Sequence, residues 1–117
     1  MRVCVAVCGA PLEAVAWAAG IGADRIELYT EPFAAAFAAD REAGIRQFAL
    51  YAAAAEQAHA LGMGINAGHD LDLANLEVFA DLPHLDEVSI GHALISDAVF
   101  RGLDVVVRDY LAKLQTP

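Results

Sequence analysis

The stretch EVSIGHALISDAVFRG, residues 87–102, shows most directly how this chain is built. Polar and aliphatic side chains alternate over residues 87–90, which is the period of a β-strand, and apolar side chains recur at helical spacing over residues 94–100. Only Gly91 and His92 stand at the junction of the two patterns. Because a strand that leads almost directly into a helix is typical of βα units, this stretch predicts an α/β fold with parallel strands.

Three earlier runs also have the composition of short buried strands, and segments of helical character separate them. These runs are RVCVAVC (2–8), RIELYT (25–30) and GINA (64–67), with EVSIG (87–91) as the fourth strand. We expect a long helix over residues 45–61, and a second helix that Asp70 or Asp72 caps and that runs to about Asp81. Residues 31–44 are rich in alanine without a clean period, and we expect a short helix within a long loop there.

Each predicted strand has one aliphatic face and one face of small or polar side chains. The first strand sets Val3, Val5 and Val7 against Cys4, Ala6 and Cys8, the second sets Ile26 and Leu28 against Arg25, Glu27 and Tyr29, and the last sets Val88 and Ile90 against Glu87, Ser89 and Gly91. A doubly wound sheet, which helices cover on both sides, would have two apolar faces. In a (β/α) barrel the outer strand face meets helices, and near the carboxyl ends of the strands the inner face meets ligand.

The pattern therefore predicts the parallel (β/α) TIM-barrel type, with residues 1–117 as a single domain of about four βα units. Four units are half of a (β/α)₈ barrel, so two strand edges and the inner face would be left exposed.

The chain has 117 residues and a net charge of −9, with 16 acidic and 7 basic side chains. This balance argues against a nucleic-acid partner, which a basic surface would attract. The apolar runs are shorter than the ~18 residues of a membrane-spanning helix, so no membrane partner is expected. The start MRVCVAVCGAP reads as a strand rather than a signal peptide, and we expect a cytoplasmic protein.

Two cysteines lie in the first predicted strand. Four strand residues would separate Cys4 from Cys8 by ~13 Å, whereas a disulfide needs Cα atoms ~4.4–6.8 Å apart. We expect two small buried thiols in a reduced compartment.

Several side chains with useful chemistry follow or interrupt these strands. Glu27 lies on the inner face of the second strand, where a carboxylate needs a partner. It would serve either catalysis or an ion pair with Arg25 or a more distant arginine. His69 follows the third strand, at the end where barrel enzymes place their chemistry, and it would act there as a general acid or base or remain a loop histidine in solvent. We expect no metal, because the histidines lack ligand spacing and the nearby aspartates suit helix caps.

Gly91 and His92 predict an anion site. The first-turn amides of a helix lack intrahelical acceptors, so they attract phosphate without a lysine or arginine. Gly91 would let the backbone approach the ligand, and His92 would add a donor. The alternative is a capping turn in which the glycine merely relieves strain.

The motifs GADRIELYTEPFAAAF, GINAGHDLDLANL and EVSIGHALISDAVFRGL together resemble the pyridoxine 5′-phosphate synthase family. The resemblance covers essentially the whole chain and corresponds to the carboxyl-terminal half of that family's (β/α)₈ barrel. It implies the last step of de novo vitamin B6 synthesis, in which 1-deoxy-D-xylulose 5-phosphate and 3-amino-2-oxopropyl phosphate give pyridoxine 5′-phosphate, phosphate and water. It also implies no cofactor and a homo-oligomer acting on phosphorylated small molecules.

The resemblance assigns roles to five residues. Glu27 matches the glutamate that stabilises a transition state, and His69 matches the proton donor. Asp70, Gly91 and His92 match positions that bind the aminoketone phosphate.

Some positions depart from the family's pattern. An aromatic residue and an aspartate are usual near Ala6 and Cys8, and a glycine is usual at Glu31. The family's other catalytic residues, including a general-base histidine and a second glutamate, belong to the amino-terminal half of its barrel. We therefore expect a fragment that is nearly inactive by itself. The alternatives are a half-barrel that self-associates and binds phosphate without turnover, and a different half-barrel enzyme such as a sugar-phosphate isomerase.

Overall fold

A single parallel sheet runs through the computed structural model, which describes residues 3–8 and 12–114. Its strands are β1 (Cys4–Cys8), β2 (Arg25–Tyr29), β3 (Gly64–Gly68) and β4 (Leu85–Ser89), and they are ordered β1-β2-β3-β4. Each strand pairs in parallel with the strand that follows it in the chain. The predicted parallel α/β fold is confirmed; residue 2 of the first predicted strand lies outside the described residues.

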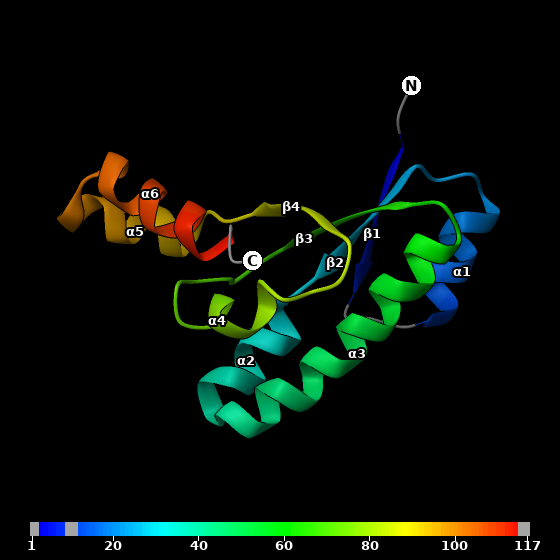
Figure 1. The fold of residues 1–117 in the computed structure, drawn as a ribbon, viewed down its shortest axis with the longest axis horizontal. Coiled ribbons are helices and arrows are strands. Elements are labelled where there is room, and N and C mark those ends of the chain that lie inside the picture. Colours follow the sequence, from blue (N-terminus) through cyan, green and yellow to red (C-terminus); the bar gives the residue numbers. More distant parts are fainter. Residues whose placement is uncertain (1–2, 9–11, 115–117) are drawn as a thin grey trace.

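The helices alternate with these strands and gather on one side of the sheet (Figure 1). They are α1 (Leu12–Gly20), α2 (Glu31–Ala39), α3 (Arg41–Ala60), α4 (Leu76–Phe79), α5 (His92–Arg101) and α6 (Leu103–Leu114). Helices α5 and α6 pack against each other beyond the end of β4 (Figure 1). Within the described ranges, no helix is both long and apolar enough to cross a membrane.

The prediction of a long loop over residues 31–44 is wrong. This segment forms α2 and the first residues of α3, because alanine is the strongest helix former even where the hydrophobic period is unclear. The two helices meet at Asp40, whose carboxylate accepts a hydrogen bond from the Glu42 amide at 3.4 Å and so caps α3.

Two other boundaries also differ from the prediction. Helix α4 has only four residues, because side-chain bonds organise the loop before it in place of a helical turn. It ends at Phe79 rather than near Asp81, where the backbone continues in tighter turns such as the bond from the Asp81 amide to the Val78 carbonyl at 3.2 Å. Strand β4 lies two residues earlier than predicted, at Leu85–Ser89, and its pairing with β3 is interrupted by an extra residue, Asp86.

The aliphatic face of the sheet forms the core with the helices. Strand register sets the aliphatic residues of neighbouring strands side by side, as in Val7 beside Leu28 and Leu28 beside Ala67. The helices add a cluster of aromatic rings in mutual contact, made of Phe33, Phe48, Tyr51 and Phe79. Burial of this face contributes roughly 25 cal/mol per Å² of apolar surface, which makes it the main source of stability.

The opposite face of the sheet is open. Ala6, Glu87 and Ser89 are exposed on it, and Cys4 is an exposed free thiol, so the prediction of a buried Cys4 is wrong; the side chain of Cys8 lies outside the description. Cys4 is exposed because the helices cover only one side of the sheet. Partial burial, followed by the negative charge of Glu27, raises the pKa of the Cys4 thiol, which favours the less reactive protonated form.

Candidate active site

An open depression of about 810 Å³ lies at the carboxyl ends of the strands, on the open face of the sheet. All five residues predicted for the site line it, although they come from three separate segments of the chain: Glu27, His69, Asp70, Gly91 and His92. Parallel strands end at the same edge of a sheet, so residues that follow different strands converge there. The remaining lining residues are Ala6, Tyr29, Gly68, Val88, Ser89 and Ile90.

The turn after β3 presents His69. Its φ is 100° and that of Asp70 is 61°, a left-handed conformation that is uncommon for residues other than glycine. The imidazole contacts the Tyr29 ring at 4.5 Å between centroids, and its Nε2 lies 3.7 Å from Asp70 Oδ2. The ring therefore lies at the strand ends, half exposed, where it can exchange a proton with a bound molecule.

Two buried polar side chains hold this turn from behind. The Thr30 hydroxyl donates to the His69 carbonyl at 2.5 Å, and the Asn75 amide donates to the Asp70 carbonyl at 3.1 Å. Asn75 also exchanges hydrogen bonds with Asp72 in both directions, each at 2.8 Å. A left-handed conformation costs free energy in residues other than glycine, so it persists only where the surrounding structure stabilises it. These hydrogen bonds stabilise it at His69 and Asp70.

These bonds also decide the expected helix cap. Asp72 binds the backbone of Asn75 ahead of α4, while the Asp70 carboxylate points to His69 instead. The sequence predicts that one of two aspartates caps this helix. In the described residues, the Asp72 side chain accepts a backbone hydrogen bond just before α4, and the Asp70 side chain does not.

Glu27 lies deeper on the open face. The predicted pair with Arg25 is wrong: within the described residues, Arg25 donates to Asn66 at 2.9 Å and pairs with Asp86 at 3.9 Å. Glu27 instead extends along the strand toward Gly68, where an added Cβ would lie 3.1 Å from Glu27 Oε1. Gly68 therefore leaves the space that the carboxylate occupies, and Glu27 faces the depression.

Helix α5 begins where β4 ends. Gly91 is its N-cap, His92 its first residue, and the Gly91 carbonyl accepts from the Ile95 amide at 2.9 Å. The φ of Gly91 is −120°, outside the left-handed region that favours glycine, and no described atom lies within 4 Å of where its Cβ would be. A left-handed turn thus does not explain this glycine, and the open space over the helix amides suits an approaching anion.

The charge around the depression is unusual for an anion site. Among the described residues that line it, none is a lysine or arginine, and Glu27 and Asp70 are acidic. Attraction for phosphate would have to come from backbone amides and the histidines. Within the described residues no group of three histidine, cysteine or acidic side chains is arranged to hold a metal ion.

The departures from the family pattern also fall here. Ala6 lines the depression, and Glu31 begins α2, where a carboxylate favours the positive end of the helix dipole. Glu31 also lines a second hollow of about 320 Å³, which shares Asp70, Gly91 and His92 with the first.

Sequence reasoning missed three supporting residues, namely Tyr29, Thr30 and Asn75. The position of Thr30 directly after a strand gave a signal, because the end of a strand belongs to the site edge. No such signal exists in the sequence for Asn75. Its contact with the Asp70 carbonyl depends on a loop conformation that the hydrogen bonds between Asn75 and Asp72 stabilise.

A parallel sheet of βα units, with its candidate chemistry at the carboxyl ends of the strands, defines a TIM-barrel-type α/β protein, and the described residues form four of its strands. The chain belongs to the family described as "Pyridoxal phosphate biosynthesis protein PdxJ", whose model matches residues 2–116. The family resemblance predicted from the sequence is therefore confirmed.

Curated relatives named pyridoxine 5′-phosphate synthase agree with this assignment. The protein of Porphyromonas gingivalis is 56% identical over 104 residues, which are 88% of this chain and 42% of that protein. Those of Cytophaga hutchinsonii and Leptospira biflexa are 54% and 53% identical, over 84% and 80% of this chain and 40% and 36% of theirs. The chain thus spans about two fifths of the length of the relatives it matches.

Proposed function

We propose that these residues supply part of the active site of a pyridoxine 5′-phosphate synthase. The enzyme would condense 1-deoxy-D-xylulose 5-phosphate with 3-amino-2-oxopropyl phosphate and release pyridoxine 5′-phosphate, phosphate and water. The observation that carries the proposal is the convergence of five family-matched residues, from three segments, on one depression. We further propose a cytoplasmic homo-oligomer that acts without a cofactor.

Each residue has a role that its surroundings support. His69, half exposed beside Tyr29, would give and take the protons of Schiff-base formation and dehydration. Glu27 would stabilise cationic character as the ring closes. Asp70 would bind the aminoketone, and the amides at Gly91 and His92 would bind its phosphate.

The isolated chain should turn over poorly. Its depression is open on the side away from the helices, and strands β1 and β4 both have unpaired edges within the described structure. Strands from polypeptide outside these residues would close the barrel, exclude water and add the remaining acid–base groups.

A chimera tests this function directly. These 117 residues would replace the aligned segment of the Porphyromonas gingivalis relative, and product formation would be measured against the intact relative and the isolated chain. We expect an active chimera, an almost inactive isolated chain, and a loss of about 10²–10⁴-fold in kcat on His69→Asn. A well-folded chimera without turnover would contradict the function, and turnover by the isolated chain at the rate of the intact relative would contradict the need for further strands.

A second candidate is a self-associating half-barrel that binds phosphate without turnover. The two open edges favour it, because two copies could pair β4 of each with β1 of the other. A dimer whose melting temperature rises with phosphate, but which forms no product, would support this function over the first.

A further inference from the structure

The pairing of β3 with β4 contains an irregularity. Ile65 pairs with Leu85, but the next residue, Asn66, pairs with Glu87, so Asp86 is an extra residue in β4. From there the pairing continues regularly to Gly68 beside Ser89. An insertion of this kind is a β-bulge, and bulges often re-aim the side chains that follow them.

The bulge determines which side chains of β4 lie on the open face of the sheet. With it, Glu87 and Ser89 share the open face with Asn66 and Gly68, and Val88 lies beside Ala67 and packs against the core. Without it, Asn66 would pair with Asp86, and each later residue of β4 would change face. Glu87 would then face the core, and Val88 and Ser89 would exchange their present sides.

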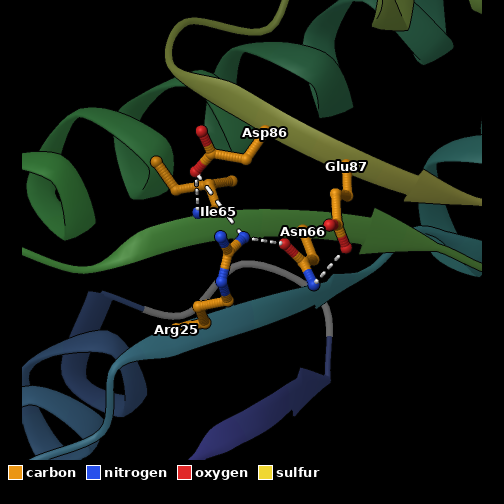
Figure 2. A network of polar contacts seen from close by, with 5 residues as sticks. All are labelled: Arg25, Ile65, Asn66, Asp86 and Glu87. Carbon is orange, nitrogen blue, oxygen red and sulfur yellow. Dashed lines mark hydrogen bonds and ion pairs between the residues drawn. The ribbon is translucent and has the colours of Figure 1, made fainter. Parts of the chain in front are cut away.

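The Asp86 side chain anchors the bulge at this point (Figure 2). Its Oδ2 accepts the backbone amide of Ile65 at 2.9 Å, in place of a ladder carbonyl, and lies 3.9 Å from the Arg25 guanidinium. One carboxylate thus joins β4 to β3 through the backbone and to β2 through a side chain.

Neighbouring residues fit this anchor. A Cβ on Gly64 would lie 3.1 Å from both Asp86 Oδ2 and Arg25 Cγ, so a larger residue there would crowd the pair where it meets over β3. Arg25 also donates to Asn66 Oδ1 at 2.9 Å, and the Asn66 amide reaches Glu87 Oε2 at 3.5 Å (Figure 2). A chain of polar contacts therefore runs from Asp86 through Arg25 and Asn66 to Glu87, the first residue after the bulge.

We infer that Asp86 is a positioning residue, whose carboxylate holds β4 in the register that places Ser89, Gly91 and His92 at the site. Asp86 itself lies about 10 Å from Ser89 along the strand, at ~3.3 Å per residue, and does not line the depression. The role of Asp86 in the strand register is independent of the proposed function. Only the expectation that the site binds phosphate rests on that function.

The test compares Asp86→Ala with Asp86→Asn in the full 117-residue chain. The asparagine retains an oxygen that can accept the Ile65 amide, whereas the alanine does not. Cross-strand nuclear Overhauser contacts read the register, and titration with inorganic phosphate reads the site. We expect Asp86→Ala to exchange the Asn66–Glu87 contact for one between residues 66 and 86 and to weaken phosphate binding about tenfold or more. Asp86→Asn should retain both, as should Asp104→Ala, a change at an exposed aspartate of α6.

Wild-type register and phosphate affinity in Asp86→Ala would overturn the inference. If that variant does not fold, the unaltered chain still tests it: the Ile65 amide, bonded to Asp86, should be protected from hydrogen exchange, and this protection should persist in Asp86→Asn. An Ile65 amide that exchanges as fast as an unbonded one would overturn the inference equally. If the unaltered chain binds no phosphate, the proposed phosphate site fails, while the register contacts still decide the role of Asp86.

Discussion

At the scale of single residues, the position of His69 depends on backbone conformation more than on contacts of the imidazole. Its left-handed φ, followed by that of Asp70, turns the chain at the end of β3 so that the ring lies against Tyr29. Thr30 is fully buried and Asn75 nearly so, and both use their side chains to bond carbonyls of this turn. A buried polar group that loses its partner is costly, so the turn and its supports stabilise one another.

Thr30→Val tests this support. Valine keeps the shape of threonine but leaves the His69 carbonyl without its donor, so we expect a loss of about 1–2 kcal/mol in the free energy of unfolding. The contact between the Tyr29 and His69 rings should weaken as well. Denaturant unfolding and ring-proton spectra measure the two effects. Thr30→Ser, which retains the hydroxyl, should preserve the ring contact; its loss in both variants would show that the hydroxyl is not responsible.

Alanine substitutions at the two glycines of the site, Gly91 and Gly68, should affect stability differently. Gly91→Ala meets empty space at a φ of −120°, so the free energy of unfolding should change by less than about 0.5 kcal/mol while phosphate affinity falls. Gly68→Ala crowds Glu27 Oε1 and the Ser89 Cβ and carbonyl, each at 3.1 Å, so it should destabilise the chain. Unfolding curves and phosphate titrations distinguish the two. An unchanged phosphate affinity in Gly91→Ala would argue against an anion over this helix.

At the scale of the elements, α2 and α3 cross closely. A Cβ at Gly44 would lie 2.7 Å from the Cα of Phe37, a backbone atom that cannot move without shifting α2. We expect Gly44→Ala to cost about 1–3 kcal/mol in the free energy of unfolding, despite the better helix propensity of alanine. Gly20→Ala is the matched control, because no described atom lies within 4 Å of its Cβ position. Equal stability of the two variants would show that the helices can separate at little cost.

Glu77 in α4 connects two other helices. It accepts from Lys113 of α6 at 3.3 Å and lies 3.5 Å from Arg41 of α3; the hydrogen bond from Lys113, above all, lowers the pKa of its carboxyl from the ordinary 4.5. A lowered folded-state pKa adds stability that is complete above pH 4.5 and is lost as the pH falls through the lowered value. We expect Glu77→Gln to reduce the loss of melting temperature on acidification. If the melting temperature falls equally with decreasing pH in Glu77→Gln and in the parent chain, the proposed contribution of Glu77 to stability would be contradicted.

At the scale of the whole molecule, the open face of the sheet is unbalanced in charge. Glu27, Asp86 and Glu87 are carboxylates on or beside it, with the Arg25 guanidinium as their neighbour. Two copies that covered each other's open faces would bring these carboxylates together, and the chain already has a net charge of −9. The open edges therefore favour self-association while the charges oppose it.

The balance predicts a salt dependence. Raising the ionic strength from about 0.05 M to about 0.5 M shortens the screening length, so self-association should strengthen. Sedimentation over a concentration series measures it, and Glu87→Gln should strengthen association at low salt. Association that weakens with added salt would mean that attractive charge pairs, rather than the uncharged strand edges, hold the copies together.

The sequence by itself determined the four parallel strands, their aliphatic and open faces, and the edge at which Glu27, His69, Gly91 and His92 gather. These follow from local patterns, since the period of two decides which side chains share a face and the parallel order of βα units places the strand ends together. Tertiary structure alone decided the bulge at Asp86, the partner of Arg25 and the support of the His69 turn by Thr30. Each of these features depends on contacts between residues that are distant in the sequence. The alternation of side chains along a single strand carries no information about such contacts.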